Sequence, residues 1–262
     1  MNRHRHFYLG IGTVLLSACG SLTQETPVES ELRYEMTAFK ITSSADCEDQ
    51  TNCAVYEVTY PQFSGVDPSV ATSIQSLIDQ SFAMGDPDAE DKSVQQIAAD
   101  FIANYNEFTR EFPDSGQGWF YQGQARVNVL LDTLISLSVD EEYYTGGAHG
   151  GTGRYFINVD PRTGKEYTLK EFFNPAFDGE LHSAGEEIFR RQRQLADTAS
   201  FQQNYFEFPE NTFRLNDNFG WTSEGVIFYF NNYEVAPYAA GPTEVFIPME
   251  KVKGWLRTKP AL

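Results

Sequence analysis

The stretch YYTGGAHGGTGRYFINVDPRTGKEYTLKEFF, residues 143–173, decides the fold because it joins the two halves of the chain. Its first part is a glycine-rich loop around the one histidine of the stretch, His149. Residues 154–159 then alternate apolar and polar side chains as a strand does, and residues 160–165 carry turn chemistry. The pattern that begins at Thr168 fits a capping box before a helix. The stretch therefore predicts a loop, a strand, a tight turn and a helix start in that order.

The chain before this stretch mixes helices and strands. Helical spacing of apolar residues follows Asp67 and again follows Ser93, and both residues are good N-caps. Alternating patterns predict strands over residues 32–42, 54–63 and 119–139, the last being a hairpin with its turn at residues 131–133.

The chain after the stretch continues in the same way. We expect a helix over residues 178–196, and further strands over residues 213–215, 225–230 and 243–247 before a short final helix. The basic run of the first of these helices, Arg190, Arg191 and Arg193, is interpreted as a solvated face, with an anion site as the alternative. The absence of a repeating strand–helix–strand rhythm predicts an α+β fold, with mostly antiparallel sheets, packed helices and two subdomains of similar size. These subdomains are residues 33–142 and residues 143–262.

The N-terminal segment is typical of export. Basic residues precede a short apolar run, and Leu16-Ser17-Ala18-Cys19 resembles a bacterial lipobox. The interpretation is a lipoprotein signal peptide over residues 1–18, a palmitate-type lipid on Cys19 and a flexible tether over residues 19–32. Gly20 after the lipidated cysteine indicates the outer membrane, with the protein facing the periplasm of the bacterial cell envelope.

The charge of the chain narrows its possible partners, and its cysteines predict a disulfide. The chain carries 37 acidic and 19 basic residues, a net charge of −18. Removal of the signal peptide would take away Arg3 and Arg5 and leave about −20. Such a surface argues against nucleic acid as a partner. In an oxidising compartment we expect Cys47 and Cys53 to form a disulfide, with a metal pair as the alternative.

Catalytic motifs are weak in this sequence. No HExxH, GxSxG or Walker motif is present, so we expect no cofactor, no metal site and no catalytic residue. Three roles stay open for His149: a structural role in its loop, a binding contact, or catalysis with nearby carboxylates such as those of residues 140–142. The tyrosines that flank the glycine loop and a later loop are candidate binding residues, because tyrosine offers a large contact area with a polar tip. These candidates are Tyr143, Tyr144, Tyr233 and Tyr238.

Two blocks carry a family resemblance. The first runs from Tyr143 through the GGAHG segment to Phe173, and the second is YEVAPYAAGP, residues 233–242. Together they resemble the exported domain of RsiV anti-sigma factors and the non-catalytic N-terminal region of PdaC-type peptidoglycan deacetylases. The resemblance implies an α+β fold, a PdaC-like first subdomain and an RsiV-like second one. It also implies lysozyme binding as in RsiV, whereas the deacetylase motifs and the membrane-spanning helix of those families are not found in this sequence.

These observations predict a lipid-anchored envelope protein that binds a ligand without catalysis. The expected partners are the membrane, through the N-terminal lipid, and lysozyme or a cell-wall glycan such as peptidoglycan. The alternative is an envelope glycan hydrolase or deacetylase that uses His149 with nearby carboxylates.

Overall fold

A computed structural model describes residues 32–47 and 52–257. The signal peptide, Cys19 and nearly all of the tether lie outside the described residues, so those expectations stay predictions. Within the described residues, no helix combines the length and apolar character needed to cross a membrane.

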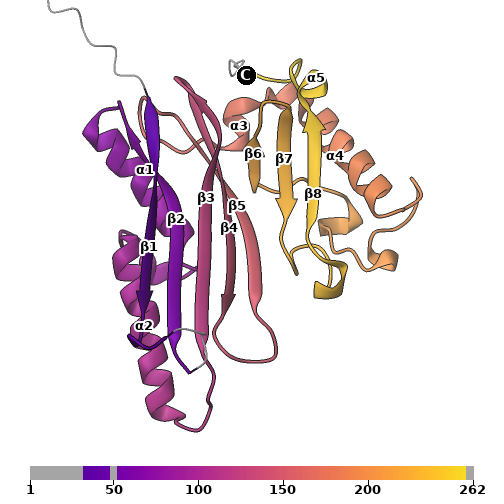
Figure 1. The fold of residues 1–262 in the computed structure, drawn as a ribbon. Helices are drawn as coiled ribbons and strands as arrows, with labels where there is room; N and C mark the ends of the chain where they lie inside the picture. Colours follow the sequence, from indigo (N-terminus) through magenta and orange to yellow (C-terminus); the bar gives the residue numbers. More distant parts are fainter. Residues whose placement is uncertain (1–31, 48–51, 258–262) are drawn as a thin grey trace, which may run out of the picture. The chain divides into compact units, whose positions relative to one another are not determined.

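The strands form two sheets (Figure 1). The first sheet has five strands in the order β1-β2-β3-β4-β5: β1 (Arg33–Thr42), β2 (Ala54–Ser64), β3 (Trp119–Leu131), β4 (Leu134–Tyr144) and β5 (Gly151–Val159). The second has three, in the order β6-β7-β8: β6 (Phe219–Trp221), β7 (Gly225–Phe230) and β8 (Thr243–Pro248). All neighbours are antiparallel except β2 and β3, which are parallel because two helices cross over between them. The expected α+β class is confirmed.

The helices follow the sequence signals closely. They are α1 (Pro68–Ser81), α2 (Val94–Glu111), α3 (Leu169–Phe172), α4 (Asp178–Gln192) and α5 (Met249–Val252). The Asp67 carboxylate accepts from the Ser69 backbone N–H at the start of α1, and Ser93 and Gln96 form the expected capping box of α2. These side chains satisfy backbone N–H groups that the first helical turn leaves without partners.

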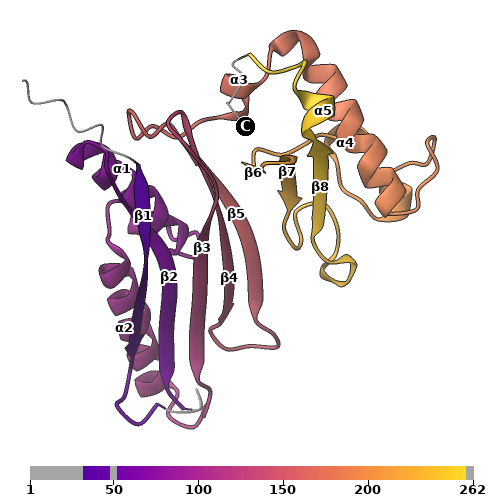
Figure 2. The same ribbon diagram turned by 45° about the horizontal axis from the view of Figure 1, so that its top comes forward.

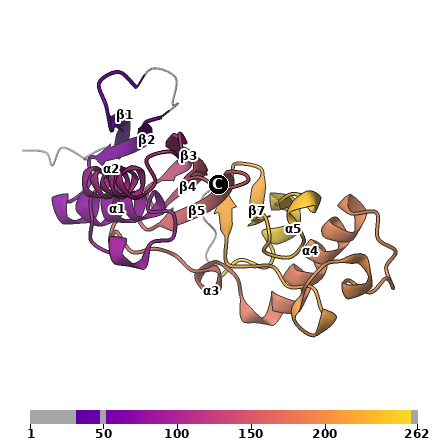
Figure 3. The same cartoon turned by 90° about the horizontal axis from the view of Figure 1, so that it is seen from below.

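Each sheet has its own apolar core. Helices α1 and α2 cover one face of the first sheet, which Figure 3 shows looking along the strands. Helix α4 packs beside β8 of the second sheet (Figure 2). The second core is built mainly from aromatic rings, and the ring of Phe189 contacts those of Phe201, Phe206, Phe208, Phe213 and Phe230.

Asparagine side chains join the edge of β5 to the C-terminal half. The Arg154 backbone N–H donates to Asn231 Oδ1 at 2.8 Å, and the Arg154 carbonyl accepts from the amides of Asn231 and Asn218. The Phe156 N–H donates to Asn218 Oδ1 at 3.1 Å. The two amides thus act as peptide groups and cover an edge that would otherwise present unpaired backbone. Strand β5 pairs with β4 and so belongs to the first sheet, although it follows the subdomain boundary expected at residue 143. That boundary stays a prediction.

Three local expectations can be compared with the structure. Cys47 and Cys53 form the expected disulfide, with their Cα atoms 5.8 Å apart. Residues 213–215 were expected to form a strand, but this is wrong: both apolar side chains of the segment are buried, yet its backbone pairs with no strand among the described residues. The Leu215 N–H donates instead to His182 Nδ1 at 3.0 Å.

The basic run at the end of α4 was also interpreted wrongly. Only Arg191 is mostly exposed, with 68% of its side-chain surface accessible. The Arg190 guanidinium lies 4.0 Å from the Phe201 ring centre and donates to two carbonyls of the loop that follows the helix. Arg193 donates to the chain just before β8. Two of the three arginines therefore hold loops in place and do not form a solvated face.

Candidate functional site

The glycine loop is the tip of the β4–β5 hairpin. Gly146 and Gly147 both have φ of +96°, a backbone conformation that other residues rarely adopt. The Tyr144 hydroxyl closes the tip by donating to the Gly147 carbonyl at 2.9 Å. These contacts place His149 on the exposed side of the loop.

The glycines of β5 make room for side chains of β4. A Cβ atom on Gly151 would lie 2.3 Å from Cζ of Tyr143, and one on Gly153 would lie 2.8 Å from Oε1 of Glu141. Tyr143 therefore lies across β5 and packs against the first core, half-buried. Tyr144 is also half-buried and stacks on Phe120, with the ring centres 6.4 Å apart. Both tyrosines therefore pack within the hairpin and contribute little to its outer surface.

The other three candidates meet in space. The His149 ring stacks on Tyr238, with the ring centres 4.9 Å apart and the planes at 24°. Tyr238 lies next to Tyr233, with the ring centres 5.4 Å apart. Tyr233 is 64% exposed and Tyr238 42% exposed. We call His149, Tyr233 and Tyr238 the aromatic surface.

The loop that carries the two tyrosines is held by an arginine. Arg193 Nη1 donates to the Ala240 carbonyl at 2.8 Å, and Nη2 donates to the Pro242 carbonyl at 3.0 Å. The same nitrogen reaches the Gly241 carbonyl and the Thr243 hydroxyl. On the other side, Asn232 Nδ2 donates to Thr152 Oγ1 at 3.1 Å and ties the loop to β5. These hydrogen bonds hold the loop of Tyr233 and Tyr238 between Arg193 and β5.

The surroundings of His149 bear on its possible chemistry. Its Nδ1 lies 2.8 Å from the carbonyl oxygen of Gly150, and no carboxylate or hydroxyl is hydrogen-bonded to it among the described residues. The buried carboxylate of β4, Glu141, accepts instead from the Tyr121 hydroxyl at 3.0 Å, and burial raises its pKa. Three or more potential metal ligands do not gather anywhere in the described ranges. Within the part of the chain that the structure describes, the surroundings of His149 offer ring contact and show no positioned proton-transfer partner.

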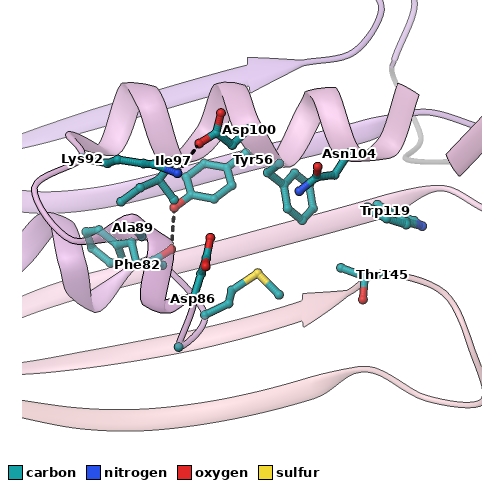
Figure 4. A pocket seen from close by; sticks show the side chains of 14 residues that line it. Tyr56, Phe82, Asp86, Ala89, Lys92, Ile97, Asp100, Asn104, Trp119 and Thr145 are labelled. Carbon is teal, nitrogen blue, oxygen red and sulfur yellow. Dashed lines mark hydrogen bonds and ion pairs between the residues drawn. The ribbon is translucent and has the colours of Figure 1, made fainter. Parts of the chain in front are cut away.

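A cavity of about 540 Å³ lies between α2, the segment that follows α1 and the first sheet (Figure 4). Aromatic rings from three segments form part of its wall, those of Tyr56, Phe101 and Trp119. No pattern in the sequence indicates this cavity, because its lining comes from several separate segments that only the fold brings together.

Two segments of the chain match known family models. Residues 47–152 match the family model described as deacetylase PdaC. Residues 170–250 match the model described as protein of unknown function DUF3298. The expected PdaC-like region is therefore confirmed, and the two matches indicate a protein related to the cell envelope. The resemblance to RsiV stays a prediction.

Solved structures share the fold. A DUF3298 family protein of Bacteroides fragilis superimposes with a TM-score of 0.69 at 17% identity, covering 88% of this chain and 96% of that one. A DUF3298 family protein of Pseudomonas aeruginosa gives a TM-score of 0.62 at 22% identity, covering 87% and 96%. At these identities the likeness establishes the fold alone.

Curated relatives match only briefly. The immunogenic proteins MPT64 of Mycobacterium tuberculosis and MPB64 of Mycobacterium bovis are 49% identical to this chain over 39 residues. That match spans 15% of this chain and 17% of the length of those relatives.

Proposed function

We propose that the chain is a lipid-anchored binding protein of the bacterial cell envelope, without catalysis, whose aromatic surface binds a basic protein of the lysozyme class. The observation that carries this proposal is the stacking of His149 on Tyr238, which combines two distant loops into one exposed patch. Exposed tyrosines are enriched where proteins bind each other, because each ring contributes a large contact area and loses little conformational entropy.

The charge of the chain supports a basic partner. With a net charge of −18, the chain attracts cationic proteins over long range and speeds their encounter. Exposed carboxylates also lie close to the patch in sequence, at Glu234 beside Tyr233 and at Glu244 just after the loop. A salt bridge already links Glu244 to Arg154 at 3.3 Å, so Glu234 and the overall field contribute most of the attraction. Raising the ionic strength should therefore weaken the complex.

The test is calorimetry of the protein without its signal peptide against lysozyme. Tyr238→Ala should weaken binding at least tenfold, because it removes the central ring of the patch. The matched control is Tyr34→Ala, which removes a similarly exposed tyrosine from β1, at the edge of the first sheet opposite β5. Equal affinities for the two variants would refute the surface.

The ligand is tested separately from the surface. A titration with soluble peptidoglycan fragments runs beside the lysozyme titration. Binding of the fragments without binding of lysozyme would transfer the proposal to a cell-wall glycan. If neither lysozyme nor the fragments bind, both proposed ligands are refuted.

A further inference from the structure

We infer that the cavity of Figure 4 is a second binding site, which takes an uncharged hexopyranose unit of a glycan. This inference does not depend on the proposed function, because the cavity shares no residue with the aromatic surface.

Aromatic rings form one side of the cavity. The rings of Tyr56 and Phe101 meet edge to face with their centres 5.6 Å apart, and the ring centres of Phe101 and Trp119 are 5.9 Å apart. Tyr56 is fully buried and Phe101 is only 8% exposed, so the half-buried Trp119 supplies most of the ring surface that this wall presents. Such a wall suits the apolar C–H face of a sugar ring.

Polar side chains of α2 also line the cavity. Asp100 and Asn104 stand one helical turn apart, and Lys92 pairs with Asp100 at 2.8 Å (Figure 4). Thr145, from the tip of the β4–β5 hairpin, adds a hydroxyl to the lining. Within the described part of the chain, neither the Asn104 amide nor the Thr145 hydroxyl takes part in a hydrogen bond. These two groups are therefore available to sugar hydroxyls at the edge of the ring.

The charges of the lining select against other ligands. Lys92 is already neutralised by Asp100, and Asp86 adds a further carboxylate, so a phosphate or a sugar acid would be repelled. A lipid chain would desolvate these polar side chains and offer them no hydrogen bonds in return. An uncharged ring with one apolar face and a hydroxyl-bearing edge matches both the ring surface and the polar groups of the lining. Its volume, about 540 Å³, falls within the range of ligand sites, which is roughly 300–1,000 Å³.

The experiment titrates the protein with N,N′-diacetylchitobiose and its trisaccharide by calorimetry, with tryptophan emission as a second readout. Trp119 lines the cavity, so a bound sugar should change its emission. Asn104→Ala should weaken binding at least fivefold. The matched control is Asn106→Ala, an exposed asparagine of the same helix that does not line the cavity. Tyr238→Ala should leave the affinity unchanged.

Three results would overturn the inference. The first is no saturable binding of either sugar by the wild-type protein. The second is equal sugar affinity of the Asn104→Ala and Asn106→Ala variants. Both asparagines are exposed, so neither change should impair folding and the two variants can be compared directly. The third is loss of sugar binding in Tyr238→Ala, which would assign the sugar to the aromatic surface and leave the cavity without a ligand.

Discussion

Replacement of Arg193 by Met should lower the free energy of unfolding of the C-terminal half, although its apolar core stays intact. Methionine keeps the aliphatic part of the side chain but loses the guanidinium, which lies 5.7 Å from the Phe206 ring centre, and with it every hydrogen bond. The lost bonds include those to the carbonyls of residues 240, 241 and 242, which precede β8.

The magnitude follows from the number of acceptors. Each hydrogen bond to a charged donor contributes about 1.5–3 kcal/mol when well placed, but one guanidinium serves all of them and the carbonyls can recover some water. We therefore expect a loss of about 2–4 kcal/mol in the free energy of unfolding. With a urea dependence of about 3 kcal/mol per molar, the unfolding midpoint should fall by roughly 1 M.

Arg191→Met is the matched control, because it removes the exposed arginine of the same run and its ion pair with Glu187 at 3.9 Å. An exposed pair of this kind contributes about 0–1 kcal/mol. Urea unfolding followed by tryptophan emission compares the two variants with the wild type. Equal midpoints for the two variants would show that Arg193 is solvated after all and does not hold the loop.

Other predictions concern titratable groups. Burial lowers the pKa of His182 below its ordinary value of 6.5, and the neutral ring accepts the Leu215 N–H through Nδ1. The contribution of His182 to stability is therefore present above that value and is lost as the pH falls through the folded pKa. His182→Asn keeps an acceptor and should show a smaller fall in urea midpoint between pH 7 and pH 5, and a fall as large as that of the wild type would contradict this role. Burial raises the pKa of Glu141, so its contribution is present at low pH and is lost as the pH rises through the folded pKa. Glu141→Gln should therefore gain thermal stability relative to the wild type on going from pH 4 to pH 7, and a constant difference across this range would count against the buried charge.

The sequence by itself determines the local elements of this chain, such as helix caps and tight turns. The caps at Asp67 and Ser93 and the hairpin turn after β3 depend on residues a few positions apart. Their physical causes are backbone hydrogen bonds and fixed dihedral angles, which act within one or two turns of chain. The same holds for the glycine loop, whose backbone reversal requires residues that tolerate positive φ.

Tertiary structure decided the features that involve distant segments. Residues 213–215 alternate like a strand, but the partner of their backbone is the side chain of His182. Strand β6 was not expected, and its Gly220 faces Phe156 so closely that a Cβ would lie 2.1 Å from Cδ1 of that ring. Arg190 and Arg193 look like a charged surface in sequence, and only the fold shows the carbonyls they bind.

The candidate sites divide in the same way. Sequence supplied the residues of the aromatic surface, because glycines and tyrosines in loops have a recognisable chemistry. Only the fold decided that His149 meets Tyr238 while Tyr143 turns into the first core. The cavity beside α2 had almost no signal in sequence, because a cavity is the space between packed elements and no single segment encodes it.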